Sequence, residues 1–250
     1  MARNRTCMYC GSPAKTNEHI IATQFIDVLC KDPRGVTLPI VLYVTLPSGQ
    51  AHRIPGKILK RRRYTLEYTT RVCSRCNNEW MNDMDDAAFP YLSEMIQGNN
   101  VTLDAIAREA VAGWVCKVAI TARAQPFNPF PVDPEWSSWL YRQHSPTPSC
   151  CVWVGLFVGK KPFHYEPMDV RIQEPGVSGL RQNGVMATLV IGYLIAQIFG
   201  VPGARGLNVP EERALPLIWP FSTDVSWPPA VCIDDAALGN WTNRFSPPTP

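Results

Sequence analysis

The alternation of apolar and polar residues is clearest in the middle of the chain, where it has a helical period. Apolar side chains recur at near-helical spacing over residues 80–96 and again over residues 103–123. Both stretches are therefore predicted to be helices with one buried face. We expect Pro90 to divide the first helix in two and Gly98 to end it. Thr102 is expected to cap the second helix.

Short apolar and β-branched runs on both sides of these helices predict strands. The runs occupy residues 36–46, 50–55, 64–72, 150–159, 164–173 and 185–199. Prolines dominate residues 126–149, which are expected to form a connector with short elements. The pattern predicts an α+β fold: a domain over residues 1–125 with trailing helices, then a β-rich, proline-rich accessory domain over residues 126–250.

The composition fits a folded chain with a substantial core, since 46% of the residues are hydrophobic and 18% are charged. The charge is unevenly distributed along the sequence. Residues 1–80 contain 13 Lys and Arg against 5 Asp and Glu, whereas residues 81–250 contain 11 against 16. A basic first third beside an acidic remainder suggests that the first third meets a polyanion.

Nine cysteines, an odd number with four of them in CxxC pairs, argue against a secreted disulfide framework. Reduced thiols in the cytoplasm fit better. No apolar segment follows the two early arginines, so no signal peptide is expected. The most apolar run, residues 185–199, is shorter than the 20 or so residues that a membrane span needs. No membrane partner is therefore expected.

Two CxxC pairs, Cys7 with Cys10 and Cys73 with Cys76, are the strongest chemical signal in the sequence. Four thiolates are the ligand set of a closed, tetrahedral zinc site. The pairs are separated by 62 residues, so the zinc prediction requires an insertion, over about residues 27–70, that loops out between the two halves. The alternative is that the pairs are unrelated to each other.

A Glu18-His19 dipeptide lies between the two cysteine pairs, and Asn77 directly follows the second pair. A single Glu-His dipeptide is a weak signal, because a structural histidine is the usual explanation. Three features favour chemistry: its place between the zinc-binding halves, the nearby amide oxygen of Asn77, and the basic first third. A base, oxygen ligands for a cation and positive charge are what metal-assisted hydrolysis of a phosphodiester requires.

The order Cys-x2-Cys, acidic-His, Cys-x2-Cys-Asn resembles the HNH (His-Me finger) endonucleases, in the zinc-stapled, endonuclease VII-like variant. The similarity covers roughly residues 1–85, and the continuation through Trp80 and Met81 is similar to members from bacteria and phages. It implies a treble-clef-like ββα-metal domain in which structural zinc is separate from a catalytic Mg²⁺ or Mn²⁺. By this resemblance His19 is the general base, and Glu18 and Asn77 are ligands of the catalytic cation.

The sequence departs from the family pattern at three positions. Tyr68 stands about where many members have Asn, Glu18 replaces the commoner Asp, and Asn77 replaces the final His. These departures leave an alternative open, in which a degenerate HNH scaffold is a non-catalytic, zinc-dependent module that binds nucleic acid or protein.

A basic run in the expected insertion is the candidate nucleic-acid contact. It contains Lys57, Lys60, Arg61, Arg62 and Arg63. Next to a nuclease site these side chains are expected to contact phosphates, although a solvated surface is the usual fate of a charge run. DNA is the expected partner, and RNA is not excluded. For residues 126–250, substrate recognition, sensing and homodimer formation all stay open.

Overall fold

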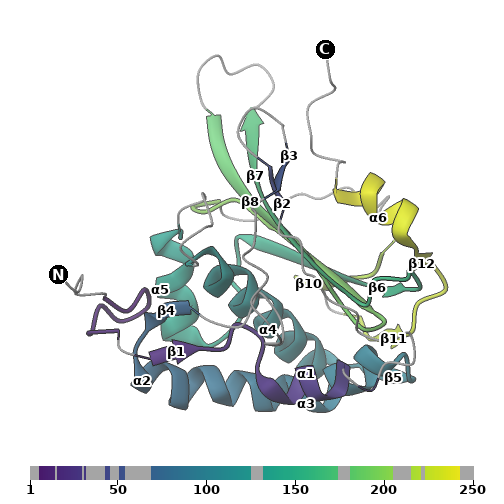
Figure 1. Ribbon diagram of the computed structural model, residues 1–250, viewed down its shortest axis with the longest axis horizontal. Coiled ribbons are helices and arrows are strands. Elements are labelled where there is room, and N and C mark those ends of the chain that lie inside the picture. The colour runs from purple at the N-terminus through teal and green to yellow at the C-terminus, as the bar shows by residue number, and fades with distance from the viewer. Residues whose placement is uncertain are drawn as a thin grey trace.

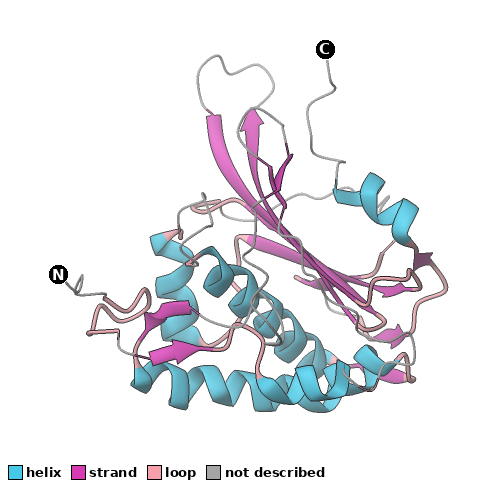
Figure 2. Cartoon of the chain, viewed as in Figure 1, coloured by secondary structure: helices cyan, strands magenta, loops and turns pink. Residues whose placement is uncertain are grey.

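The computed structural model describes residues 6–14, 16–29, 31, 43–45, 51–53, 69–124, 132–173, 181–204, 215–220 and 223–242. Its elements form a mixed α+β fold, as predicted from the sequence (Figure 1). The two longest helices lie before residue 125, and the strands of the main sheet all lie after residue 149. Helices and strands are coloured separately in Figure 2. In the part of the chain that the structure describes, no helix is both long and apolar enough to cross a membrane.

The helices, in chain order, are α1 (Thr23–Leu29), α2 (Ser74–Cys76), the π-helical turn η1 (Asn77–Met81), α3 (Asn82–Gln97), α4 (Ala105–Arg123), α5 (Pro134–Gln143) and α6 (Asp235–Thr242). The strands are β1 (Thr16–Glu18), β2 (Tyr43–Thr45), β3 (Ala51–Arg53), β4 (Thr69–Val72), β5 (Val101–Leu103), β6 (Cys150–Phe157), β7 (Phe163–Gln173), β8 (Arg181–Ile191), β9 (Leu194–Gly200), β10 (Leu217–Trp219), β11 (Val225–Trp227) and β12 (Cys232–Ile233).

The main sheet has the strand order β10-β6-β9-β8-β7, and β12 adds to β6 in parallel. The other neighbours are antiparallel. The predicted strands over 150–159, 164–173 and 185–199 are confirmed, and the last region supplies two strands, the end of β8 and nearly all of β9. Gly192 and Tyr193 make the turn between them, and Gly192 has a left-handed φ of 60°.

One buried apolar cluster joins the helices to the sheet. It runs from Cys7 at the cysteine cluster to Trp227 in β11 and includes residues on both sides of residue 125. Helix α4 lies at its centre, and every described side chain from Val111 to Ala124 is buried. The expected division at residue 125 stays a prediction, but the apolar core is continuous across it.

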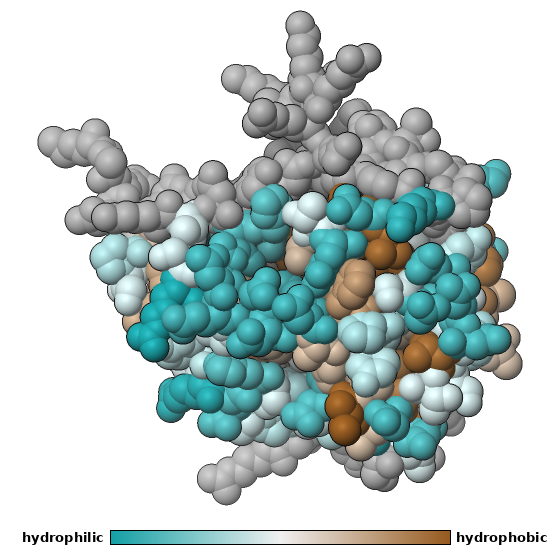
Figure 3. Space-filling view, turned by 90° about the horizontal axis from the view of Figure 1, so that it is seen from below, coloured by the Kyte–Doolittle hydropathy of each residue, from teal (hydrophilic) through white to brown (hydrophobic). Residues whose placement is uncertain are grey.

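Helix α3 runs unbroken through Pro90, so the predicted division at that residue is wrong. Proline removes only one backbone donor from the helix, and Pro90 is exposed, on the side where carbonyl groups can turn toward water. The predicted end at Gly98 is confirmed, with φ 78° and hydrogen bonds back to the last turn. The lower face of the molecule, along which α3 runs, is mainly hydrophilic with isolated apolar residues (Figure 3).

The cap of α4 is Asp104, so the assignment of that role to Thr102 is wrong. The Asp104 carboxylate accepts a hydrogen bond of 2.9 Å from the Ala107 amide, while Thr102 pairs with Ser226 as β5 and β11 meet. The pairing of β5 with β11 therefore places Thr102 in a strand, and α4 begins only at Ala105. The proline-rich connector also contains α5, which Asp133 caps.

Candidate metal centre

The first CxxC pair lies in a tight loop that turns both thiols to the same side. The Cys7 amide donates to the Ser12 carbonyl at 2.7 Å, and the Gly11 amide donates to the Cys7 carbonyl at 3.0 Å. Gly11 has φ 73°, a left-handed conformation that a glycine adopts without strain. These bonds give the loop, which we call the knuckle (residues 6–13), a shape that suits two metal ligands.

The second CxxC pair opens a helix directly after β4. Cys73 caps α2, and its sulfur accepts a hydrogen bond of 3.5 Å from the Cys76 amide. The Met8 amide in the knuckle donates to the Arg71 carbonyl in β4 at 2.8 Å. Strand β4 therefore connects the two pairs, although 62 residues separate them in the sequence.

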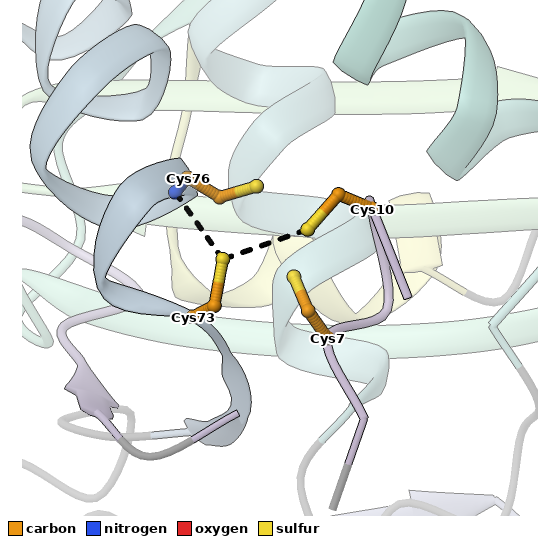
Figure 4. A group of neighbouring side chains, drawn as sticks. All are labelled: Cys7, Cys10, Cys73 and Cys76. Carbon is orange, nitrogen blue, oxygen red and sulfur yellow. Dashed lines mark hydrogen bonds between the residues drawn. The ribbon is translucent and has the colours of Figure 1, made fainter. Parts of the chain in front are cut away.

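The four thiols converge, as the sequence predicts (Figure 4). Their sulfur atoms all lie within 4.8 Å of one another, and the Cys10 and Cys73 sulfurs are 3.5 Å apart. A tetrahedral zinc ion with Zn–S bonds of about 2.3 Å needs sulfur–sulfur distances of about 3.8 Å. The group can therefore hold one metal ion such as zinc, with no ligand position left for a substrate.

The environment of the thiols fits a site built for a cation. Cys7, Cys73 and Cys76 are buried and Cys10 is partly exposed. Burial raises the pKa of the Cys7 and Cys76 thiols above the ordinary value. Without a metal such thiols stay protonated, so binding of a divalent cation would release protons from this cluster.

Aromatic rings pack against one another beside the cysteine cluster. Trp80 makes an edge-to-face contact with Tyr9 of the knuckle, with ring centroids 4.9 Å apart. On another side it stacks on His144, at 5.4 Å and an interplanar angle of 7°. Trp80 is a core residue, as its apolar helix face suggests, while the contact of His144 with it joins α5 to the metal centre. Nothing in the local sequence around His144 indicates this pairing.

The three residues assigned to a catalytic centre have different surroundings. Glu18 ends β1 and is buried, whereas His19, which follows it, and Asn77, which begins η1, are partly exposed. Among the residues that the structure describes, the cysteine cluster is the one group of three or more Cys, His, Asp or Glu side chains with ligand atoms this close. Joint cation binding by Glu18 and Asn77 stays a prediction.

The residues predicted to contact nucleic acid lie outside the described residues, as does Tyr68. They are Lys57, Lys60, Arg61, Arg62 and Arg63.

A buried charged pair beneath β1 is a feature that sequence reasoning missed. Lys117 of α4 and Asp85 of α3 form an ion pair, with 2.5 Å between Nζ and Oδ1. The side chain of Lys117 is fully buried and that of Asp85 nearly so. In the sequence, the sign of a buried charge is the single lysine within the otherwise apolar run of residues 110–120.

The carboxyl group of Glu18 lies close enough to Lys117 and Asp85 to interact electrostatically with both. Burial raises its pKa to about 7, with the nearby Lys117 lowering the pKa and Asp85 raising it further. Burial also raises the pKa of Asp85, against the attraction of Lys117. Two carboxyl groups therefore share one buried ammonium group, and Glu18 is the one without an ion pair of its own among the described residues.

Glu18→Gln is expected to stabilise the protein at alkaline pH. A folded-state pKa of about 7, above the ordinary value of 4.5, means that folding favours the protonated form. Wild-type stability then falls as the pH rises from 4.5 through 7, by about 3 kcal/mol in all. Urea unfolding of both proteins at pH 5 to 8.5 should show a stability difference that grows by about this amount in favour of the variant.

Both proteins keep the cysteine cluster, so the pH dependence of metal binding cancels in this comparison. Glu109→Gln removes a carboxylate from the exposed side of α4 and serves as the control. A difference between wild type and Glu18→Gln that stays constant with pH would contradict the assignment of a buried, titrating Glu18.

Comparisons of the chain with protein-family models, with curated proteins and with solved structures find no match.

Proposed function

We propose that the protein is a metal-dependent endonuclease that hydrolyses phosphodiester bonds of DNA. The observation that carries the proposal is the order of elements around the cysteine cluster. The knuckle leads into β1, β1 pairs with β4 in antiparallel orientation, and β4 leads into the helix that begins at Ser74. His19 follows β1 and Asn77 lies one turn into the helix, which supports a ββα-metal arrangement.

The surroundings of His19 suit a general base. Partial burial lowers the pKa of its imidazole below the ordinary value of 6.5, which keeps the ring neutral at physiological pH. A neutral ring nitrogen can take a proton from water as the water attacks phosphorus. His19 also lies outside the cysteine cluster, so that zinc in this cluster would support the fold and leave the base free of it.

Catalysis by this route needs a second cation, Mg²⁺ or Mn²⁺, which would neutralise charge that develops on the phosphate. The described residues do not form a site of three acidic or histidine ligands for it. Magnesium sites on nucleotide substrates commonly use one or two protein oxygens, with water and phosphate completing the coordination. The Asn77 amide is the partly exposed candidate for such a ligand, whereas the buried Glu18 carboxyl group suits a supporting role better.

The excess of positive charge in the first 80 residues supports a nucleic-acid substrate, with 13 basic against 5 acidic side chains. Basic side chains hold phosphate groups without reading sequence. DNA is the substrate that the family resemblance favours, and an RNA substrate would use the same charge.

His19→Ala is expected to lower the rate of plasmid nicking in Mg²⁺ or Mn²⁺ by a factor of about 10² to 10⁴, the usual contribution of a general base. Metal content and melting temperature should stay close to those of wild type, because His19 is not a cysteine-cluster ligand. His164→Ala is a matched control, since His164 lies on β7 and is hydrogen-bonded to Glu166 at 3.2 Å. Nicking by His19→Ala at the wild-type rate would remove His19 from the mechanism.

A second candidate is a non-catalytic, zinc-dependent module that binds nucleic acid or protein, and two observations favour it. The Glu18 carboxyl group is buried next to Asp85 and Lys117. Asn77 lies in η1, eight residues before Asp85, and is partly exposed, so its surroundings differ from those of Glu18. DNA affinity that falls with salt, without cleavage in either cation, would select this module over the nuclease.

A further inference from the structure

The main sheet narrows to two strands at one of its ends. Strands β6 and β9 both end at the row in which Cys150 pairs with Gly200, and Gly200 pairs in turn with Val185 of β8. Beyond this row, among the strands that the structure describes, only β7 and β8 continue. Figure 1 shows them extending away from the helices. We call this two-stranded extension, residues 170–173 and 181–184, the ribbon.

The ribbon has the composition of a surface that binds a polyanion through hydrogen bonds. Arg171 lies opposite Asn183, and Gln173 lies opposite Arg181. Because successive positions of a strand alternate between its faces, these four positions share one face of the ribbon. Arginine pairs with guanine edges, and asparagine and glutamine pair with adenine edges. The eight residues of the ribbon include no acidic residue.

The dimensions of the ribbon fit the major groove of B-form DNA. Four residues in each strand reach about 13 Å beyond the end of β9. The groove is about 12 Å wide and 8.5 Å deep and admits a two-stranded ribbon. The major groove of duplex RNA is too narrow for such readout. Aromatic residues, on which the bases of single strands stack, are absent from the eight residues of the ribbon.

A second hairpin beside β7 adds positive charge next to the ribbon. It consists of β2 and β3, and β2 lies against β7 (Figure 1). The six residues of its two strands include His52 and Arg53 and no acidic residue. Strand β3 ends at Arg53, and the predicted phosphate-binding run begins at Lys57 in the sequence. Basic residues from the first third of the chain therefore meet the ribbon from its second half.

We propose that the ribbon binds double-stranded DNA in the major groove, with Arg171 and Arg181 contacting base edges. The proposal deepens the proposed function, because it names duplex DNA as the substrate, and it rests on that function only for cleavage. Binding through the ribbon requires neither His19 nor a catalytic cation. It also gives the second half of the chain a role in substrate recognition.

The first test measures the affinity of the full-length protein for labelled duplexes of mixed sequence by fluorescence anisotropy, without Mg²⁺ or Mn²⁺ so that no cleavage occurs. Wild type should bind duplex DNA about tenfold or more tighter than duplex RNA of the same sequence. Arg171→Ala/Arg181→Ala should lower the affinity for duplex DNA by about tenfold or more. Its affinity for duplex RNA should stay within about twofold of the wild-type value.

Lys160→Ala/Lys161→Ala is the matched control. It removes the same charge from an exposed turn at the opposite end of β7, so its affinity for duplex DNA should stay within about threefold of wild type. Unchanged DNA affinity in the arginine variant would overturn the inference. Equal wild-type affinity for the two duplexes would overturn it as well, as would a wild type that binds no duplex DNA.

A second measurement uses wild type alone, so a folding defect in the variant cannot decide the outcome. Phenylglyoxal modifies accessible guanidinium groups, and mass spectrometry gives the rate of modification for each arginine. Duplex DNA should slow the modification of Arg171 and Arg181 severalfold, and duplex RNA should not. Rates that are the same with and without duplex DNA would overturn the inference, even if the arginine variant binds DNA weakly.

The two proposals fail in different ways. Protection of Arg171 and Arg181 by duplex DNA, without cleavage in Mg²⁺ or Mn²⁺, would support the ribbon as a DNA-binding surface and reject the proposed nuclease. Cleavage of DNA by a protein whose ribbon arginines stay unprotected would support the nuclease and overturn the inference about the ribbon.

Discussion

Cys73→Ala is expected to abolish metal binding and to unfold the structure around the knuckle. Cys73 supplies one of four sulfurs and also caps α2 through the Cys76 amide, so its loss removes both a ligand and a helix cap. In zinc-finger peptides the apparent free energy of structural zinc binding is about 10–16 kcal/mol, and this energy is folding energy. Metal content should fall from one zinc ion per chain to less than about a tenth of that.

Elemental analysis of the purified proteins, together with circular dichroism melting before and after chelation, measures this effect. Cys232→Ala removes an exposed cysteine far along the chain and should leave both metal content and melting temperature at wild-type values. A Cys73→Ala protein that keeps one zinc ion per chain would show that the cluster does not hold the metal through all four thiols.

Gly192→Ala is expected to destabilise the protein by about 4 kcal/mol, through backbone strain and overpacking together. Gly192 has φ 60°, and a Cβ atom there would lie 2.2 Å from the carbonyl oxygen of Ile96 at the end of α3. The neighbouring Tyr193 amide donates to the same carbonyl at 2.9 Å. The turn cannot withdraw without loss of this bond between the helices and the sheet.

The matched control is Gly203→Ala. Gly203 has a similar φ of 81°, but the nearest atom to an added Cβ is a side-chain oxygen 3.7 Å away. Gly203→Ala therefore introduces backbone strain without a steric clash, at a cost of about 1 kcal/mol. Thermal melts should show Gly192→Ala about 10 °C below wild type and Gly203→Ala only a few degrees below. Equal losses for the two variants would contradict a steric contact at Ile96.

Most features that the sequence predicts correctly are set by neighbouring residues, and the convergence of the cysteines is the exception. Gly98 ends its helix because a left-handed residue is needed there and glycine adopts it. Strands β6 and β9 and the end of β8 lie in apolar runs of the sequence. Convergence of the four cysteines is also predicted well, since few arrangements other than a shared metal require two CxxC pairs in a chain of reduced thiols.

The predictions that fail depend on residues distant in the chain. Thr102 is a good cap in isolation, yet Ser226 pairs with it and the cap passes to Asp104. Pro90 interrupts an isolated helix, yet packing of α3 on both sides of it keeps the helix whole. Local propensity carries no information about these partners.

The candidate catalytic residues show the same limit. The Glu18-His19 dipeptide stands out in the sequence because of its neighbours, but Glu18 is buried close to Asp85 and Lys117, which come from two later helices. An acidic residue beside a histidine looks equally suited to bind a cation or to orient its neighbour. Only the packing of α3 and α4 beneath β1 shows that this carboxyl group is buried.

The continuous core around α4 has a consequence for how the cell would remove this protein. Proteases cut chains where the backbone can open locally, and a chain of separable domains can lose one and keep another. Here the cysteine cluster and β11 belong to one apolar cluster, so a cut that frees α4 exposes apolar surface toward both ends of the chain. A cut beside α4 is therefore expected to destabilise the apolar core on both sides of residue 125.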